Sequence, residues 1–418
     1  MSILKITGGR RLDGSLRVQG AKNSALPLLA ASVLTEGLSV FRNCPRLTDV
    51  AATVRILRHV GCRVYEEGDA LYVDASGPIS PEVPDALMRQ MRSSVIFLGA
   101  LLSRCGEASL CLPGGCELGP RPVDLHLLAL RTLGAEVTEA GGRLCCRAAR
   151  LKGGRIDLPS PSVGATENAM LAAVLAEGST VITGAAREPE LLDLQDYLRS
   201  CGALVTGAGS GVIRICGAEK LRGGEKRILP DRIAAATWLA ACAAAGGRVR
   251  LYDACPQHMA HVLHALRRMG CAVSTGENLI VLERRGDLLS PGPIVTRPHP
   301  GFPTDAQPPL MAASLKAAGT TVMIETVFES RYRHVPALRS MGADISAAGK
   351  TAVIRGVKTL HGGDVTASDL RGGAALAIAA LSAEGETVLR GMEHVDRGYE
   401  DMAEALTALG GEVSLRKE

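Results

Sequence analysis

Aromatic side chains are scarce in this chain of 418 residues. One Trp, six Tyr and four Phe make up 3% of the sequence, whereas apolar residues of all kinds make up 46%. The core must therefore be built from aliphatic side chains and alanine. A chain of this length exceeds what one hydrophobic core usually serves, so we expect two or more domains.

An excess of one charge and long uncharged stretches are missing as well. The formal net charge is only +4, and no run of five or more Lys or Arg occurs, which argues against a nucleic-acid surface. No stretch has the length and freedom from charge of a membrane span, and the N-terminal segment MSILKITGG lacks an apolar signal region. We predict a soluble, cytoplasmic protein that binds neither nucleic acid nor membrane.

Disulfide and metal patterns are also absent from the sequence. The twelve cysteines lack CxxC or disulfide-framework spacing, so we interpret them as reduced thiols. His258, His261 and His264 are spaced three apart, so on a helix the outer two diverge, and no carboxylate completes a site. We predict a solvated helix face there and no metal. GAGSGV (207–212) lies between strand-like stretches, as expected of a hairpin turn.

Glycine, by contrast, is abundant and marks an internal repeat. A small-residue pair ending in glycine recurs at 35–37, 104–106, 176–178, 245–247, 317–319 and 383–385. A second marker, such as VGCRV (60–64), follows each of them. Its glycines lie 68 to 73 residues apart and are Gly61, Gly134, Gly202, Gly270, Gly342 and Gly410. The chain therefore consists of six copies of one unit.

Each copy has the same order of predicted elements. An apolar stretch such as NAMLAAVLA precedes the first marker and is predicted to be a helix buried on most sides. A β-branched run, an amphipathic helix capped by the marker glycine, and one or two strands follow. We predict the α/β class, with two similar domains, 22–229 and 230–418, each of three βαβαββ-type units around buried helices. A single solenoid is the alternative, and it would need atypical capping repeats.

Polar and charged residues gather where the buried helices begin. Capping of the first helical amides explains Thr304, Asp305, Ser368 and Asp369. It does not explain the basic residues at these helix starts, because a cation there opposes the helix dipole. These basic residues are Lys22, Arg92, Arg232 and Arg371.

More arginines occupy matching loops between the first marker and the second helix of a repeat. They are Arg121, Arg331 and Arg397. Repeat logic gathers them at one rim of a cleft between the domains. We interpret the combined cations as a site for a ligand with several negative charges, such as phosphates and a carboxylate.

The segment PGGCELGPRPVD (113–124) places Cys116 in a glycine-rich loop. A cysteine is usually a small packing residue, but this one lies outside any apolar run and five residues before Arg121, where a cation favours the thiolate. A Cys–His hydrolase would need a base such as His126. Nothing in the sequence completes that dyad.

These motifs resemble one family of enzymes closely. PGGCELGPRPVD, GAKNSALPLLAA, SVGATENAMLAAVLAEG, PGFPTDAQ, ETVFESRYRHV, SDLRGGAA and HVDRGYED are similar to those of the UDP-N-acetylglucosamine 1-carboxyvinyltransferase (enolpyruvyl transferase) family. The resemblance covers essentially the whole chain. It implies an inside-out α/β barrel fold in which residues 1–21 join the second domain.

The resemblance also implies a reaction. The enolpyruvyl group of phosphoenolpyruvate passes to the 3-hydroxyl of UDP-N-acetylglucosamine, through a tetrahedral ketal, and phosphate is released; this is the first committed step of peptidoglycan synthesis. Cys116 corresponds to the general acid, which can also form an adduct with phosphoenolpyruvate, and Asp305 to the base at the sugar hydroxyl. No cofactor and no metal are implied, because arginines supply the charge stabilisation.

Substrate contacts follow from the same resemblance. The phosphoenolpyruvate site comprises Lys22, Arg121 and Arg397 at the phosphate, Arg331 and Arg371 at the carboxylate, and Asn23 and Asp369. The UDP-N-acetylglucosamine site comprises Asn23, Arg92, Arg121, Pro122, Val123, Asp124, Leu125, Ser162, Val163, Gly164, Asp305 and Val327. Lys22 and Arg397 are counted with Cys116 and Asp305 as catalytic.

A few positions depart from the family pattern. Ala234 and Ala235 stand where an acidic residue and a glycine are usual, and Ser160 stands where some members have lysine. Two alternatives remain open at this point. One is 5-enolpyruvylshikimate-3-phosphate synthase, which should lack the cysteine loop. The other is a non-catalytic UDP-sugar-binding paralogue, which would have no use for a general acid.

Overall fold

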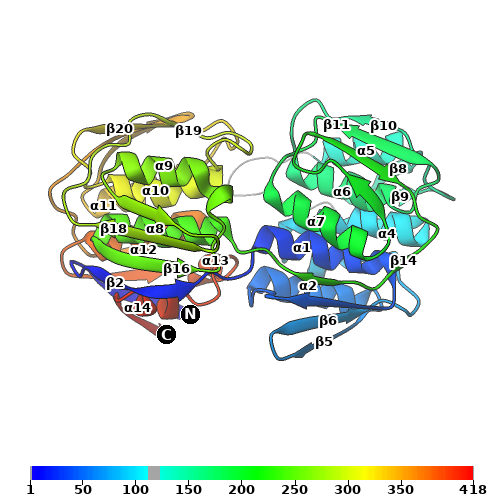
Figure 1. Cartoon of the computed structure of the whole chain (residues 1–418), viewed down its shortest axis with the longest axis horizontal. Helices are drawn as coiled ribbons and strands as arrows, with labels where there is room; N and C mark the ends of the chain where they lie inside the picture. The colour runs from blue at the N-terminus through cyan, green and yellow to red at the C-terminus, as the bar shows by residue number, and fades with distance from the viewer. Residues whose placement is uncertain (1, 112–122, 418) are drawn as a thin grey trace. The chain divides into compact units, whose positions relative to one another are not determined.

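The chain forms two compact units of similar size. The computed structural model describes residues 2–111 and 123–417, and contacts divide these residues into an N-terminal unit, 20–229, and a C-terminal unit, 2–19 together with 230–417. Figure 1 shows the elements of each unit. Among the described residues, no helix is long and apolar enough to cross a membrane.

Three sheets surround the buried helices of the N-terminal unit, one for each repeat. Their strands are β4 (Leu38–Arg42), β5 (Arg63–Glu67), β6 (Ala70–Asp74) and β15 (Glu225–Arg227); β7 (Glu107–Cys111), β8 (Glu136–Ala140) and β9 (Arg143–Arg147); β10 (Arg155–Asp157), β11 (Ser179–Thr183), β12 (Leu204–Thr206) and β13 (Val212–Cys216). A short parallel pair joins β3 (Thr35–Glu36) and β14 (Leu221–Arg222). The predicted hairpin turn at 207–211 lies between β12 and β13, which pair antiparallel as expected.

Pairing between strands of different repeats closes this unit into a ring. β10 follows the second repeat and pairs in parallel with β11 of the third. β15 follows the third repeat and pairs in parallel with β4 of the first. A single parallel bridge from Glu82 to Ser109 links the first repeat to the second in the same way. Because the third repeat pairs with the first, the solenoid alternative is wrong.

The C-terminal unit has the same plan and uses the start of the chain to complete it. Its three sheets consist of β2 (Leu12–Arg17), β16 (Gly247–Tyr252), β17 (Ala272–Thr275) and β18 (Leu279–Arg284); β19 (Ile294–Val295), β20 (Thr320–Ile324), β21 (Asp344–Ala348) and β22 (Thr351–Arg355); β1 (Ser2–Thr7), β23 (Asp364–Thr366), β24 (Glu386–Arg390) and β25 (Glu412–Lys417). β1 lies between β24 and β25, and β2 pairs in parallel with β16.

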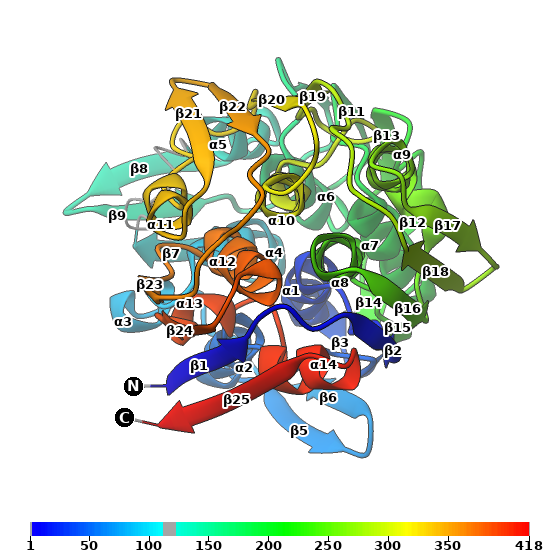
Figure 2. The same ribbon diagram turned by 90° about the vertical axis from the view of Figure 1, so that its left-hand side faces the viewer.

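Six buried helices occupy the centres of the two rings, as predicted. They are α1 (Lys22–Ala31), α4 (Phe97–Cys105) and α6 (Val163–Ala173) in the N-terminal unit, and α8 (Arg232–Ala245), α10 (Gln307–Ser314) and α12 (Leu370–Ser382) in the C-terminal unit. Figure 2 shows α8, α10 and α12 inside the sheets of their unit. In α8 every residue from Arg232 to Ala244 is buried. Its alanine-rich sequence lets neighbouring helices approach closely while keeping helix propensity high.

Short 3₁₀ turns adjoin three of these helices. η1 (Ser32–Leu34) extends α1, η2 (Arg92–Ile96) leads into α4, and η4 (Thr304–Ala306) leads into α10. Pro308 and Pro309 fall in the first turn of α10, where the missing N–H groups cost no helical hydrogen bond. Ala234 and Ala235 are buried near the start of α8, and Asp231 caps that helix through the N–H groups of Ile233 and Ala234.

Amphipathic helices cover the outside of each repeat. They are α2 (Thr48–His59), α5 (Asp124–Thr132), α7 (Pro189–Ser200), α9 (Ala260–Arg268), α11 (Val335–Ser340) and α14 (Met402–Ala408). The marker glycine follows each of them with positive φ, between 88° and 110°, as the C-cap prediction requires. Three short helical pieces, α3 (Asp85–Met88), η3 (Pro256–Met259) and α13 (Met392–Val395), lie in the connections.

Candidate active site

The starts of α10 and α12 meet at one carboxylate in the C-terminal unit. Asp305, in the turn η4, accepts a hydrogen bond from Arg331 Nη2 through Oδ1 at 2.8 Å. Its Oδ2 lies 3.3 Å from both Nε and Nη2 of Arg371, the second residue of α12. Arg331 Nη2 also donates to the main-chain oxygen of Thr304 at 2.8 Å. Two predicted carboxylate-binding arginines therefore share the predicted base.

Burial makes this cluster electrostatically strong. The side chains of Arg331 and Arg371 are only 1% and 3% exposed, and that of Asp305 is 28% exposed. Each guanidinium also lies near a ring, Arg331 at 5.3 Å from the centre of Phe328 and Arg371 at 5.4 Å from that of Tyr399. Buried charges are stable only when they are paired and hydrogen-bonded, so the cluster fixes the position of both arginines.

Each of the two arginines has a buried N–H group that is not used in these contacts. Nε of Arg331 and Nη1 of Arg371 are buried and have no hydrogen-bond partner among the described residues. Burial tends to lower the pKa of Arg371, but Tyr399, Asp305 and Asp231 raise it above its ordinary value, so the group stays charged. Orphaned guanidinium N–H groups in a buried cluster are suited to an anionic ligand.

The helix starts correct part of the capping prediction. Asp369 caps α12, because its Oδ1 accepts from the N–H groups of Arg371 and Gly372 at 3.0 and 2.9 Å. Thr304 and Asp305 have charged partners instead: the Thr304 hydroxyl donates to Glu325 Oε2 at 2.9 Å, and Asp305 accepts from the two arginines. Ser368 precedes the cap and donates to Asp369. The stronger charged partners outcompete the helix amides.

Glu325 is a structural member of this site that the sequence reasoning missed. It is 1% exposed and, besides Thr304, accepts hydrogen bonds from the N–H groups of Val327 and Phe328 at 2.7 and 3.0 Å. It therefore shapes the loop that carries Arg331. Val327, a predicted sugar contact, is 44% exposed on this loop. The only sequence signal for Glu325 was its place directly after a β-branched strand.

In the N-terminal unit, the first turn of α1 carries Lys22 and Asn23. Lys22 Nζ lies 3.3 Å from Oδ2 of Asp49 on α2, and the two side chains are 13% and 3% exposed. No side chain caps α1. Ser24 instead ties the helix to α7 by donating to Asp193, whose other oxygen lies 2.8 Å from Lys226 Nζ. These contacts hold the ammonium group of Lys22 at the helix start.

The predicted nucleotide-sugar residues of this unit lie at the starts of α5 and α6. Ser162 caps α6 through the N–H of Ala165, and Val163 and Gly164 form its first turn. A Cβ at Gly164 would lie 3.1 Å from the His126 ring, so glycine allows the two helices to approach. Val123, the exposed Asp124 and Leu125 begin α5. The structure therefore brings Ser162–Gly164 next to the α5 start.

His126 is a packing residue rather than a surface base. It is 8% exposed, and its Nδ1 lies 2.7 Å from the side-chain nitrogen of Asn168 on α6. That Asn168 nitrogen also donates to the main-chain oxygen of Val95, while Asn168 Oδ1 accepts from Gly99 N–H. Burial lowers the pKa of His126 to about 4. A neutral ring accepting at Nδ1 is a structural link between α5 and α6.

Some predicted site residues lie outside the described part of the chain. They are Cys116, Arg121 and Pro122, together with the side chain of Arg92, whose main chain begins η2. Arg397 is half-buried in the turn after α13. Ser160, one of the departures from the family pattern, is exposed before α6.

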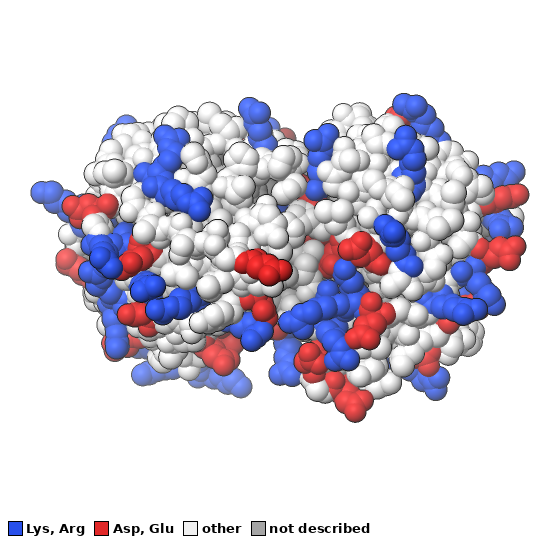
Figure 3. All heavy atoms as spheres, in the orientation of Figure 1, with Lys and Arg blue, Asp and Glu red and all other residues white. Residues whose placement is uncertain are grey.

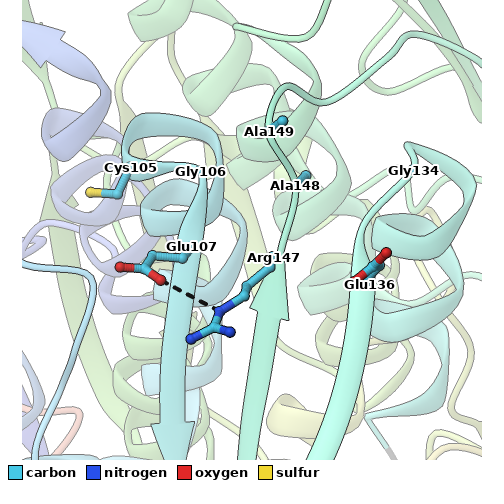
Figure 4. A pocket seen from close by; sticks show the side chains of 8 residues that line it. All are labelled: Cys105, Gly106, Glu107, Gly134, Glu136, Arg147, Ala148 and Ala149. Carbon is cyan, nitrogen blue, oxygen red and sulfur yellow. Dashed lines mark ion pairs between the residues drawn. The ribbon is translucent and has the colours of Figure 1, made fainter.

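Two pockets of the described residues lie apart from these groups. An open pocket of about 440 Å³ is lined by Cys105, Glu107, Glu136 and Arg147 around the ends of α4 and α5 (Figure 4). A smaller one, about 100 Å³, is lined by His258, His261 and His299. His258 belongs to η3 and is half-buried, so the predicted solvated face holds only for His261 and His264. Among the described residues, no group of three His, Cys, Asp or Glu could hold a metal.

Charged side chains are otherwise mixed on the surface. On the face shown in Figure 3, Lys and Arg lie interspersed with Asp and Glu over both units. This agrees with the small net charge. At the candidate site itself, by contrast, the positive charges of Arg331 and Arg371 are buried.

Residues 6–406 match the family model of EPSP synthase (3-phosphoshikimate 1-carboxyvinyltransferase). The chain belongs to this family of carboxyvinyl transferases. The fold agrees: the enolpyruvyl transferase NikO from Streptomyces tendae superposes with a TM-score of 0.89 at 28% identity, covering 99% of this chain and 98% of that one. EPSP synthase from Acinetobacter baumannii superposes over both whole chains with a TM-score of 0.77 at 21% identity, which concerns the fold alone.

Curated relatives narrow the family further. UDP-N-acetylglucosamine 1-carboxyvinyltransferase 2 of Caldanaerobacter subterraneus subsp. tengcongensis is 48% identical over 99% of both chains. UDP-N-acetylglucosamine 1-carboxyvinyltransferase 1 of Symbiobacterium thermophilum is 47% identical over 98% of this chain and 94% of its own. The enzyme of that name from Myxococcus xanthus is 44% identical over the full length of both. The resemblance drawn from the motifs is confirmed.

Proposed function

We propose that this chain transfers the enolpyruvyl group of phosphoenolpyruvate to the 3-hydroxyl of UDP-N-acetylglucosamine and releases phosphate, the first committed step of peptidoglycan synthesis. The carrying observation is the full-length identity of 44–48% to transferases of that name. The buried arginine pair around Asp305 supports it, since two guanidinium groups with spare N–H donors suit a substrate carboxylate.

The reaction divides into addition and elimination. In the addition, the Cys116 thiol gives its proton to C3 of phosphoenolpyruvate, the sugar 3-oxygen bonds to C2, and the hydroxyl proton passes to the Asp305 carboxylate. The product is a tetrahedral ketal that still carries the phosphate. In the elimination, the new methyl group returns a proton to the Cys116 thiolate, the C2–C3 double bond reforms, and phosphate departs with the electrons of its C–O bond and takes up the proton held by Asp305.

Positively charged side chains stabilise the negative charges of phosphoenolpyruvate during the reaction. Arg331 and Arg371 bind the carboxylate, and Lys22, Arg121 and Arg397 bind the phosphate as charge moves onto it. Asp369 sets the start of α12 and with it the main chain at Arg371. The proposal assigns no step to a metal or an organic cofactor.

The nucleotide sugar is assigned to the N-terminal unit and the loop of Val327. Its proposed contacts are Asn23, Arg92, Arg121, Pro122, Val123, Asp124, Leu125, Ser162, Val163, Gly164, Asp305 and Val327. The N–H groups at the start of α6 are suited to an anionic or polar ligand group. Both substrates are soluble phosphorylated molecules, so we expect the enzyme to act in the cytoplasm.

Phosphate release is the direct test. Purified protein is incubated with phosphoenolpyruvate alone, with added UDP-N-acetylglucosamine, and separately with added shikimate 3-phosphate. We expect phosphate only with UDP-N-acetylglucosamine. Release with shikimate 3-phosphate would favour the EPSP synthase alternative, and tight UDP-sugar binding without release would favour the non-catalytic one.

A further inference from the structure

One buried histidine beside the arginine pair has no part in the proposed reaction. His334 precedes α11 and is 1% exposed. Among the described residues, the main chain of Arg331 is the one hydrogen-bond partner of the ring, so at least one buried ring nitrogen has none. A buried polar group without a partner is destabilising. An apolar side chain would avoid that cost, so the imidazole at this place needs a reason.

His334 lies where the two arginine-bearing segments meet, with its Cβ against the first turn of α12. A Cβ built on Gly372 would come within 2.9 Å of His334 Cβ and 2.6 Å of Asp369 Oδ2. Only glycine therefore lets the first turn of α12 pack this closely on His334. Arg331 lies three residues before His334, and Arg371 one residue before Gly372. The contact between His334 and Gly372 thus joins the main chains that carry the two guanidinium groups.

The charge state of His334 suits this place. Burial lowers its pKa to about 4, and the guanidinium of Arg331 adds to the shift; the carboxylate of Asp369 and a hydrogen bond with the main chain of Arg331 oppose it. At neutral pH the ring is uncharged. The ring therefore adds no third cation near Arg331 that would repel it or compete for Asp305.

We propose that His334 is a positioning residue: its buried ring, beyond the close Cβ contact with Gly372, fills the space that keeps the Arg331 and Arg371 guanidinium groups at their separation. This inference rests on the proposed function, in which that pair binds the carboxylate of phosphoenolpyruvate. A carboxylate has two oxygens at a fixed spacing, so two guanidinium groups bind it well only at one separation. His334 therefore acts on affinity for phosphoenolpyruvate and leaves the sugar nucleotide untouched.

Steady-state kinetics of His334→Ala and His334→Gln test the proposal. We expect His334→Ala to raise KM for phosphoenolpyruvate about tenfold or more, because small misplacements of binding groups cost large factors in rate. The turnover number and KM for UDP-N-acetylglucosamine should change less than about threefold. His334→Gln, which keeps a polar side chain of similar reach, should recover most of the affinity. Gly372→Ala, which pushes on the same contact from α12, should reproduce the KM effect.

Leu266→Ala is the matched control. Leu266 is fully buried in α9 of the same unit, so its truncation loosens the core away from the arginines. The proposal is overturned if His334→Ala leaves KM for phosphoenolpyruvate unchanged, if both KM values and the turnover number shift together, or if Leu266→Ala gives the same selective effect.

A binding measurement separates this inference from the proposed function. Stabilisation of each variant against heat by phosphoenolpyruvate is measured without any turnover. We expect wild type, Leu266→Ala and His334→Gln to be stabilised, and His334→Ala to need about tenfold more ligand for the same shift. Wild type that is stabilised by phosphoenolpyruvate but releases no phosphate would defeat the proposed function alone. Equal ligand dependence in wild type and His334→Ala would defeat the role of His334 alone.

Discussion

The two units share a three-sheet ring but differ in what their buried helices carry at their first turns. In the C-terminal unit, η4 and α12 bring Asp305 and Arg371 together with Arg331, so the anion-binding pair is complete within the unit. In the N-terminal unit, α1 and α6 present Lys22, held by Asp49, and the cap residue Ser162. Equivalent repeat positions have thus acquired different chemistry.

Each unit also has one fully buried tyrosine, at a different place in its last repeat: Tyr197 lies within α7 and Tyr399 before α14. Tyr197 in the N-terminal unit lies 2.7 Å from the Ser39 hydroxyl and packs on Phe41. Tyr399 in the C-terminal unit lies 2.8 Å from the Thr237 hydroxyl and packs on Trp238, but it also lies beneath Arg371. Tyr197 therefore contacts only core residues here, whereas Tyr399 contacts both the core and an arginine of the candidate site. The two buried tyrosines thus differ in whether they contact a residue of the candidate site.

Removing the proposed acid should have the largest effect. Cys116→Ala is expected to lower turnover by at least ~10²-fold, the usual contribution of a general acid, with little change in UDP-N-acetylglucosamine binding. Cys216→Ala, at an exposed cysteine of the same unit, is the control. Fosfomycin, an epoxide analogue of phosphoenolpyruvate, should modify Cys116, and mass spectrometry locates the adduct. Unchanged turnover, or an adduct on another cysteine, would refute the assignment.

The arginine pair tests whether the C-terminal unit supplies the carboxylate site. Arg371→Lys keeps the charge but loses the fork that bridges Asp305, so we expect kcat/KM for phosphoenolpyruvate to fall by about 10²-fold. Arg390→Lys changes an arginine of the same unit whose side chain is 40% exposed and paired with Asp364 at 3.0 Å, and it should leave kinetics unchanged. If both variants behave alike, the buried pair has no special role in binding.

The neutral histidine of the N-terminal unit should make stability depend on pH. Burial lowers the pKa of His126 to about 4, below its ordinary value near 6.5, so between these values the unfolded chain binds a proton that the folded chain does not. Its contribution is complete above pH ~6.5 and is lost as pH falls toward 4.

His126→Gln removes this titration while keeping a side-chain acceptor for Asn168. Denaturant unfolding at pH 7 and pH 4 should show wild type losing on the order of 2 kcal/mol more than the variant. His264→Gln, at an exposed position, should behave as wild type. A variant whose free energy of unfolding falls as steeply as that of wild type would mean that His126 is not the titrating group.

The two tyrosines provide the most direct comparison of the units. Tyr197→Phe and Tyr399→Phe each remove one hydroxyl from a buried pair, so each should lower the free energy of unfolding by about 1 kcal/mol. Only Tyr399→Phe should also raise KM for phosphoenolpyruvate, because Tyr399 supports the charge of Arg371. If Tyr197→Phe raised KM for phosphoenolpyruvate, or if Tyr399→Phe left it unchanged, the idea that only Tyr399 acts on the site would be wrong.

The sequence predicted the repeats, the buried helices and the marker glycines, because these depend on local periodicity and backbone conformation. Gly61 and Gly410, for example, take the positive φ expected of a helix C-cap. It also placed Lys22 and Arg371 at helix starts. Such features are encoded within one repeat and need no long-range information.

Partner choice across repeats could not be predicted in the same way. The position of Asp305 suggested an N-cap, yet its carboxylate binds Arg331 and Arg371, which come from two other segments. His126 was considered as the base of a Cys–His dyad, yet it is buried against Asn168. Glu325 carried only one weak signal, its place directly after a β-branched strand. Each of these depends on which segments the closed ring brings together, and that is decided by packing of the whole unit.

The smallest expected effect concerns the open pocket at the edge of the sheet β7–β9–β8. Arg147 and Glu107 face each other there, with Nε and Oε2 3.5 Å apart, and their side chains are 77% and 50% exposed (Figure 4). Exposed ion pairs contribute little, so Arg147→Ala should change the free energy of unfolding by less than about 1 kcal/mol. Turnover should stay at the wild-type value, because none of the proposed substrate contacts lines this pocket. A fall in turnover, measured by phosphate release, would mean that this pocket takes part in the reaction and that the buried helix starts do not make up the whole site of the N-terminal unit.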